Sequence, residues 1–480
     1  MLKNNIILIL ACILLFLWQA LPVPAMFNET TWPLLGCMVV MIMLWMTEAI
    51  PIPVTALLPL VLFPILQVDS LKNVASSYAH PIVFLFLGGF FLALALEKSK
   101  LHERIARHIL QLTGSSLRGV VLGFLIASAL LSMFISNTAT AIMMLPIAIS
   151  VLSVLTGNVD ISYKNIFAVA LMLAIAYGAN IGGTATLIGT PPNMVLVGFL
   201  EQQYNHQISF LNWMLFGVPF ASLMLLVTYL LLVHVSFAVP NVKNEKIKEI
   251  ITQKLSALGA LRTVEKRVLV IFFFVVMGWV FKRYINDFSE AFQLSDTVIA
   301  MTGGLLMFII STGEKDAKPI LEWKDTTRIA WGIILLFGGG LALAHQLQAS
   351  GLIDMVGEEL TALTTYDTLL IIAAVAALVL LMTEVMSNVA LISIFLPLVA
   401  ALALSMEKDP LLFMIPATLA ASCAFTMPIS TPPNAIVFSS GYVHTHQMAK
   451  AGIVLNILAI ILITMLSHTW MLYVFNITFS

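Results

Sequence analysis

The chain has 480 residues, of which 60% are hydrophobic and only 10% are charged, and its mean hydropathy is +1.02. Because a soluble domain carries about 25% charged residues, this composition excludes an ordinary soluble protein and predicts that most of the chain lies in lipid. The net charge of −1 gives no support for nucleic-acid binding. The cysteines stand singly in apolar runs, which favours small buried side chains over metal or disulfide chemistry.

A membrane-spanning helix needs about 20 apolar residues to cross about 30 Å of hydrocarbon. The chain offers eleven candidate spans, at residues 5–27, 32–50, 53–68, 80–97, 165–200, 209–238, 268–286, 294–312, 329–346, 410–443 and 450–475. Lys3 and the apolar run that follows it resemble a signal peptide, but we interpret them as the first span because signal-directed secretion leaves the later spans unexplained.

Two further apolar stretches, 119–159 and 368–406, each hold a Ser-Asn pair near the middle. Each stretch is long enough for two helical arms. A helix-turn-helix that enters and leaves on the same side satisfies its own backbone and brings the Ser-Asn pair to membrane depth. We therefore expect a re-entrant hairpin at both stretches, in an all-α polytopic membrane protein.

The basic residues test this layout. With the N-terminus in the cytoplasm, the inner segments hold 19 of the 23 Lys and Arg residues, and only Lys72, Lys282, Arg283 and Lys408 lie outside. This asymmetry agrees with the positive-inside rule, and it predicts an extracytoplasmic C-terminus in an inner or plasma membrane. The basic stretch 241–267 is expected to be a cytoplasmic linker, and 98–112 is expected to lie along the inner interface as an amphipathic helix.

Short polar strings occur twice in these apolar surroundings. Ser136-Asn137-Thr138 returns as Ser387-Asn388-Val389 after 251 residues, and Thr-Pro-Pro-Asn at 190–193 returns at 431–434. The first hairpin enters from inside and the second from outside, so the repeats are predicted to have inverted topology. Such repeats place a shared binding site near the middle of the membrane.

The repeated strings offer amides, hydroxyls and, at the proline breaks, free carbonyl and N–H groups. Carbonyls and hydroxyls suit a hard cation such as sodium, whereas amides and helix N-termini suit a carboxylate. No Lys or Arg lies in these segments, so a bound anion needs a neighbouring cation, which favours cation coupling. A single Ser-Asn-Thr string would be explained better by helix packing through hydrogen bonds, but two copies paired with two helix breaks favour a binding site.

The sequence resembles the divalent anion–sodium symporter family, which comprises sodium-coupled di- and tricarboxylate transporters. The matching stretches are TEAIPIPVTALLP at 47–59, SMFISNTATAIMMLP, GGTATLIGTPPN, TEVMSNVALISIFLP and SCAFTMPISTPPN. The resemblance covers nearly the whole chain. It implies a homodimer with a scaffold part and a transport part that moves as an elevator. The implied scaffold is 1–112 and 201–363, and the implied transport part is 113–200 and 364–445, followed by a C-terminal helix at 446–480.

The resemblance also implies the ligand-binding residues. One sodium site would be formed by Ser132, Ser136, Asn137 and the backbone near Ala185. A second sodium site would be formed by Thr383, Met386, Asn388 and Ser430. The substrate carboxylates would meet Asn137, Thr138, Asn388, Val389, Thr431 and Pro432. Two positions depart from the family pattern, because Val389 has no hydroxyl to donate where a threonine would and Ala185 stands where a glycine is often found.

Glu384 is the only charged residue in 368–406. An ionisable group in a membrane segment is a functional candidate by default, and proton coupling stays open, but we favour a structural role over direct ligation.

The sequence thus predicts a secondary transporter that moves a di- or tricarboxylate, such as succinate, malate, fumarate, 2-oxoglutarate or citrate, together with sodium ions. A sodium-independent carboxylate exchanger and a sulfate transporter of the same fold are the alternatives. An enzyme is not expected, because the chain has no paired carboxylates, His cluster or phosphate-binding Gly loop.

Overall fold

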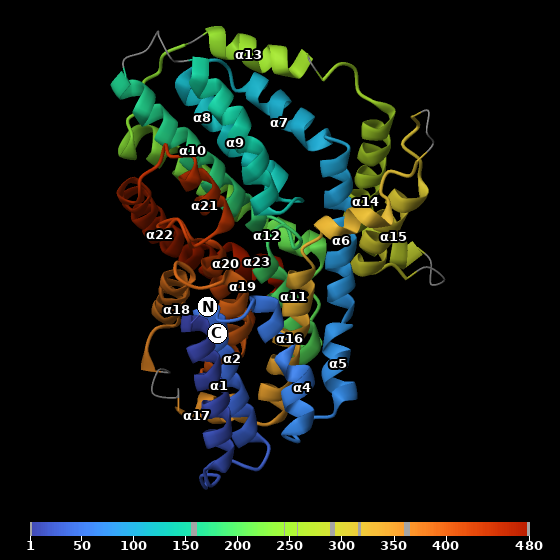
Figure 1. The fold of residues 1–480 in the computed structure, drawn as a ribbon, viewed down its shortest axis with the longest axis vertical. Helices are drawn as coiled ribbons and strands as arrows, with labels where there is room; N and C mark the ends of the chain where they lie inside the picture. The colour runs from blue at the N-terminus through green and yellow to red at the C-terminus, as the bar shows by residue number, and fades with distance from the viewer. Residues whose placement is uncertain are drawn as a thin grey trace.

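The structure is a computed structural model, and it describes residues 2–154, 161–243, 245–256, 258–288, 293–314, 318–359 and 365–477. Across these residues the fold is all-helical, with only two isolated β-bridges (Figure 1). The helices of the first half are α1 (Leu2–Ala20), α2 (Thr31–Thr47), α3 (Ile52–Thr55), α4 (Leu58–Ile65), α5 (Leu71–Tyr78), α6 (Pro81–Lys98), α7 (Leu101–Leu112), α8 (Leu117–Ser132), α9 (Asn137–Val154), α10 (Ile161–Thr184), α11 (Pro191–Tyr204) and α12 (Phe210–Leu230), which a π-helical turn (Leu231–Ser236) extends. Those of the second half are α13 (Glu245–Ser256), α14 (Thr263–Phe288), α15 (Asp296–Ile309), α16 (Trp331–Ala349), α17 (Leu352–Glu359), α18 (Thr368–Thr383), α19 (Asn388–Ser405), α20 (Leu411–Ser422), α21 (Pro432–Ser439), α22 (Thr445–His468) and α23 (Trp470–Phe475).

Seven of the described helical segments are long and apolar enough to cross a membrane, and several further apolar helices are shorter. The predicted spans fall on helices, but their bounds differ. The predicted span 53–68 consists of two short helices, α3 and α4, and the predicted span 80–97 belongs to a longer segment, Leu71–Lys98. A proline lies in the first turn of α4 and of α6, since Pro59 follows the first residue of α4 and Pro81 occupies the first position of α6.

Both predicted hairpins are present. In the stretch 119–159, α8 and α9 are joined by a short turn, and α9 begins at Asn137; residues 155–160 lie outside the described residues. In the stretch 368–406, α18 and α19 are joined in the same way, and α19 begins at Asn388. Each Ser-Asn pair therefore lies at the tip of a hairpin, at the N-terminus of the returning arm.

The two Thr-Pro-Pro-Asn strings each interrupt a helix. The first break separates α10 from α11, and the second separates α20 from α21. In both cases the prolines begin the new helix, where their missing N–H groups cost nothing.

The hairpins and the broken helices pack across the two halves of the chain. Helix α10 packs against α8 and α9 and also contacts α21, whereas α20 packs against α18 and α19 and also contacts α11. Helix α21 further contacts α9, and α11 further contacts α19. Each broken helix thus has one piece against its own hairpin and the other piece against the hairpin of the opposite half. Helix α10 is almost entirely buried, which makes it the central element of this region.

A second group of helices flanks this region. Helix α6 packs against α15, and α16 packs against α5, α11 and α19 (Figure 1). The predicted amphipathic segment 98–112 forms α7. The predicted linker contains α13, which packs on α7 and α9, and the buried Arg104 of α7 holds the end of the linker through Glu265 at 3.0 Å and the carbonyl oxygen of Gly259 at 2.9 Å. Helix α17 follows α16 closely, and residues 360–364 after it lie outside the described residues.

Candidate binding site at the tips of the two hairpins

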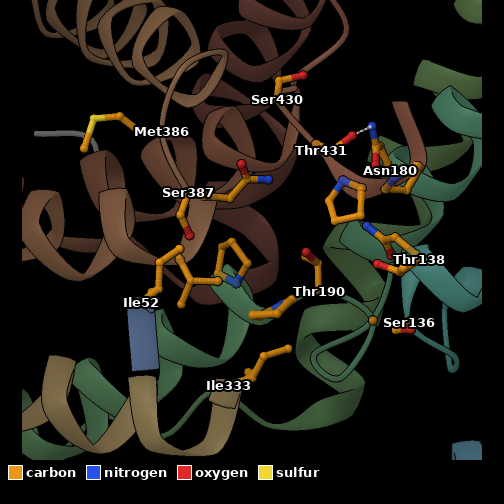
Figure 2. A pocket seen from close by; sticks show the side chains of 18 of the residues that line it. Ile52, Ser136, Thr138, Asn180, Thr190, Ile333, Met386, Ser387, Ser430 and Thr431 are labelled. Atoms are coloured by element: carbon orange, nitrogen blue, oxygen red, sulfur yellow. Dashed lines mark hydrogen bonds between the residues drawn. The ribbon is translucent and has the colours of Figure 1, made fainter. Parts of the chain in front are cut away.

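A cavity of about 720 Å³ lies where the hairpin tips meet the two helix breaks. Both Ser-Asn pairs and both Thr-Pro-Pro strings line it. Figure 2 shows Ser136 and Thr138 on one side of the cavity and Met386 and Ser387 on the other, with Thr190 and Thr431 between them. The repeated strings, which are far apart in the sequence, therefore share one cavity as predicted.

Each asparagine at a hairpin tip is held by a hydroxyl from the end of the preceding arm. Ser132 Oγ donates to Asn137 Oδ1, and Thr383 Oγ1 donates to Asn388 Oδ1 at 2.8 Å. The two pairs are 251 residues apart, which is the offset of the repeat, so the same hydroxyl–amide hydrogen bond occurs in both hairpins. Since the hydroxyls fix the amides from behind, each amide nitrogen is left to face other partners.

Nine of the predicted ligand residues line the cavity: Ser136, Asn137, Thr138, Met386, Asn388, Val389, Ser430, Thr431 and Pro432. Ser132 and Thr383 are buried behind the asparagines and do not line it. Ala185 is also buried and does not line the cavity. Helix α12 packs closely on it, because a methyl group added to Gly217 would lie 2.9 Å from the carbonyl oxygen of Ala185. The cavity wall and the supporting residues behind it are thus distinct sets.

The asparagine of each Thr-Pro-Pro-Asn string closes the helix break that precedes it. Asn193 Nδ2 donates to the carbonyl oxygens of Gly183 (3.3 Å) and Thr186 (2.8 Å). Asn434 Nδ2 donates to the carbonyl oxygens of Ala424 and Met427, both at 3.1 Å. In each half the acceptors lie ten and seven residues before the asparagine, so the same amide satisfies carbonyls that the break has freed.

Asn180 of α10 joins the two halves, and the sequence reasoning missed it. Its side chain lines the cavity and is only 1% exposed. Its Nδ2 donates to Thr431 Oγ1 at 3.0 Å, the bond drawn in Figure 2, and to the carbonyl oxygen of Ala424 at 3.3 Å. An amide in the middle of the predicted span 165–200 could have indicated a functional residue. Its partners could not be predicted, because they lie some 250 residues away in the sequence.

A second missed residue is Glu48, which ends α2 and lies on the flanking side of the cavity together with Ile52 and Ile333. Its backbone is left-handed, with φ of 48°, which an ordinary side chain rarely adopts. Among the described residues that line the cavity, Glu48 is the only charged one. The lining therefore supplies no positive side chain to an anion.

Glu384 does not line the cavity. It is 5% exposed, and its carboxylate accepts hydrogen bonds from the backbone N–H groups of the second break. This arrangement agrees with the structural role that the sequence favoured over direct ligation.

Apart from Glu48, the polar groups that line the cavity are neutral, and they fit a hard cation. The hydroxyls, amides and freed carbonyls are ligands of the kind that sodium accepts, and the described residues contain no cluster of three His, Cys, Asp or Glu side chains that would hold a transition metal.

Residues 2–477 match the family model described as "Sodium:sulfate symporter transmembrane region". Over 430 residues, the chain is 38% identical to a protein of Staphylococcus saprophyticus named "Sodium-dependent dicarboxylate transporter SdcS", and the match covers 88% of this chain and 83% of that protein. The protein of the same name in Staphylococcus aureus strain NCTC 8325 matches with the same identity and the same coverage.

Two solved structures share the fold. The Neisseria gonorrhoeae protein MtrF, whose description places it in a class of antimetabolite efflux pumps, superposes with a TM-score of 0.58 over 83% of each chain at 10% sequence identity. The Alcanivorax borkumensis YdaH transporter superposes with a TM-score of 0.53 over 84% of this chain and 88% of that chain at 12% identity. At these identities the likeness concerns the fold alone.

Proposed function

The chain belongs to the sodium:sulfate symporter family, and we propose that it is an integral membrane transporter that moves a di- or tricarboxylate together with sodium ions. The observation that carries the proposal is the cavity between the two hairpin tips. It presents the asparagine amides of both hairpin tips, the amide of Asn180, several hydroxyls and no basic side chain among the described residues. An anion held by neutral dipoles in a membrane requires a counter-charge, and co-transported sodium ions supply it.

We assign one sodium ion to the first hairpin, near Ser136 and Asn137, and another to the second hairpin, near Asn388 and Ser430. Ser132 and Thr383 support these positions by fixing the asparagine oxygens. The substrate carboxylates would lie between them, against Thr138, Val389 and Thr431. Because Glu48 gives the cavity a negative charge before ligands bind, sodium is expected to bind before the carboxylate.

The assay is uptake by purified protein in liposomes. An inward sodium gradient should drive uptake of labelled succinate or citrate, and uptake should disappear when sodium is replaced by potassium. Counterflow that persists without sodium would favour a sodium-independent exchanger instead. Competition by sulfate against succinate would indicate a sulfate transporter. No uptake of any tested carboxylate would refute the proposal.

We further propose that the hairpins and broken helices move together against the flanking helices, as an elevator within a homodimer. Ile52 on the flanking side and Ser387 on the second hairpin both line the cavity (Figure 2). A cross-link between cysteines at these two positions should stop uptake and leave sodium binding intact. Unchanged uptake after complete cross-linking would argue against this motion. Light scattering should give twice the 52.5 kDa of one chain.

A further inference from the structure

Glu384 is the best-connected buried carboxylate in this region. It ends the first arm of the second hairpin, and its oxygens accept hydrogen bonds from the backbone N–H groups of Phe425 (2.9 Å), Thr426 (3.0 Å) and Met427 (3.1 Å). Asn456 Nδ2 of α22 donates a further bond at 2.8 Å. Every one of these partners is a donor, which matches a carboxylate that accepts and does not donate. The three backbone donors are consecutive residues of the break between α20 and α21.

The same break is held from its other side. Tyr177 Oη of α10 donates to the carbonyl oxygen of Phe425 at 2.8 Å, and the two rings pack edge to face at 5.2 Å. Helix α22 packs directly on the break through Gly452, where an added methyl group would lie 2.3 Å from the carbonyl oxygen of Phe425. Gly452 and Asn456 are one helical turn apart, so they lie on the same face of α22. Helix α22 is therefore attached to the break that Glu384 holds.

This break also carries the groups assigned to the second sodium site. Ser430 Oγ donates to the carbonyl oxygen of Met427 at 2.7 Å, and Met427 N–H is one of the donors to Glu384. On the hairpin side, Thr383 directly precedes Glu384 and donates to Asn388 Oδ1. The carboxylate is thus connected to the second sodium site through one residue on each side, Met427 in the break and Thr383 in the hairpin. No described basic side chain forms an ion pair with it.

The first half has no charged side chain at the position that corresponds to Glu384. The position 251 residues before Glu384 is Met133, whose carbonyl oxygen accepts a hydrogen bond from Thr186 Oγ1. The first break is held instead by the indole of Trp213 on α12, which donates to the carbonyl oxygen of Thr184 at 3.0 Å. Both contacts are between neutral groups.

We infer that Glu384, held by Asn456, is a positioning residue that fixes the second break and places a carboxylate behind only one of the two sodium sites. The sites are therefore unequal, and the site on the second hairpin binds sodium more tightly and fills first. This inference rests on the proposed function. The physical reason is that a fixed charge attracts a cation strongly where water does not screen it.

The decisive variant is Glu384→Gln, which keeps the shape and removes the charge. We expect the sodium concentration for half-maximal succinate uptake to rise about tenfold, while the KM for succinate at saturating sodium changes less than twofold. The second readout needs no transport: the rise in melting temperature of the purified protein with added sodium, without substrate, should shift to higher sodium by a similar factor. Met133→Gln is the matched control at the corresponding position of the first hairpin, and it should leave both sodium midpoints within twofold of the wild type.

Two further variants keep the test decisive. Asn456→Ala retains the charge but removes one of its donors, and both sodium midpoints should rise two- to threefold. Glu384→Asp restores the charge, and its midpoints should fall between those of the wild type and Glu384→Gln. Wild-type midpoints in Glu384→Gln would overturn the inference; if that variant does not fold, wild-type midpoints in Asn456→Ala would do so. A wild type that shows no sodium effect in either readout would instead refute the proposed function.

Discussion

The two helix breaks have the same position in the two repeats, but different side chains stabilise them. At residues 185–190, between α10 and α11, the first break is held by a neutral indole that donates to a carbonyl oxygen. At residues 423–431, between α20 and α21, the second break is longer and is held by a carboxylate that accepts from consecutive N–H groups. The helix that comes after each broken helix packs on the break through a glycine, Gly217 of α12 or Gly452 of α22. The two breaks therefore form the cavity in the same way, but a neutral indole holds one side of it and a carboxylate holds the other.

At the hairpin tips, equivalent substitutions in the two halves should have similar effects. Asn137→Ala and Asn388→Ala each remove an amide that lines the cavity and an oxygen fixed by a hydroxyl. Hydrogen bonds to charged groups contribute about 1.5–3 kcal/mol each, and each amide is proposed to serve both an ion and a carboxylate. We therefore expect each variant to lower uptake about a hundredfold. Sodium-dependent thermal shift should show that sodium binding is lost as well.

Both variants should elute with the same oligomeric size as the wild type, which shows that the loss is local. Near-normal uptake in both would remove the Ser-Asn strings from the binding site. A loss in only one would mean that the other half contributes structure alone.

The asparagines that close the breaks should differ in their effect on stability. The side chain of Asn434 makes more hydrogen bonds than that of Asn193. Asn434 Nδ2 shares its two hydrogens among three acceptors, and its Oδ1 accepts from Asn180 Nδ2 at 3.3 Å. Asn193 Nδ2 donates to two carbonyl oxygens, and its Oδ1 has no partner among the described residues. With about 1 kcal/mol for each buried hydrogen bond, Asn434→Ala should destabilise the protein by about 3 kcal/mol and Asn193→Ala by about 2 kcal/mol. Thermal unfolding in detergent without sodium measures this order. Equal melting temperatures in the two variants would contradict the comparison.

A glycine in the last turn of α10, just before the first break, allows a close approach that the second half does not need. A methyl group on Gly183 would lie 2.8 Å from Asn137 Oδ1, whereas the corresponding residue of the second break, 241 positions later, is already Ala424. Gly183→Ala should therefore displace Asn137, and because overpacking costs about 1–3 kcal/mol, we expect about a tenfold loss of apparent sodium affinity. Ala424→Gly is the matched control and should change this affinity less than twofold. A wild-type sodium midpoint in Gly183→Ala would show that Asn137 is not constrained from this side.

The hairpins and breaks could be predicted because their signals are local. An apolar stretch of about 40 residues with at most one charged residue predicts two arms, and the consecutive prolines at 191–192 and 432–433 predict the breaks. The contacts that hold the breaks could not be predicted, because they join segments far apart in the sequence: Glu384 to Asn456, and Asn180 to Thr431. Glu48 was missed for a similar reason, since only the tertiary fold brings the end of α2 to the cavity.

The smallest expected effect concerns the one position where the hairpin strings themselves differ. Thr138 and Val389 both line the cavity, but only Thr138 carries a hydroxyl. A single hydrogen bond contributes about 0.5–1.5 kcal/mol, so Val389→Thr should shift the relative inhibition of succinate uptake by malate, fumarate and citrate by a few-fold, and Thr138→Val should shift it in the opposite direction. Expression and sodium dependence should stay at wild-type values, because neither side chain is assigned to a sodium site. Competition profiles identical to the wild type in both variants would mean that these positions do not contact the carboxylate, and the asymmetry of the site would then be confined to its sodium ions.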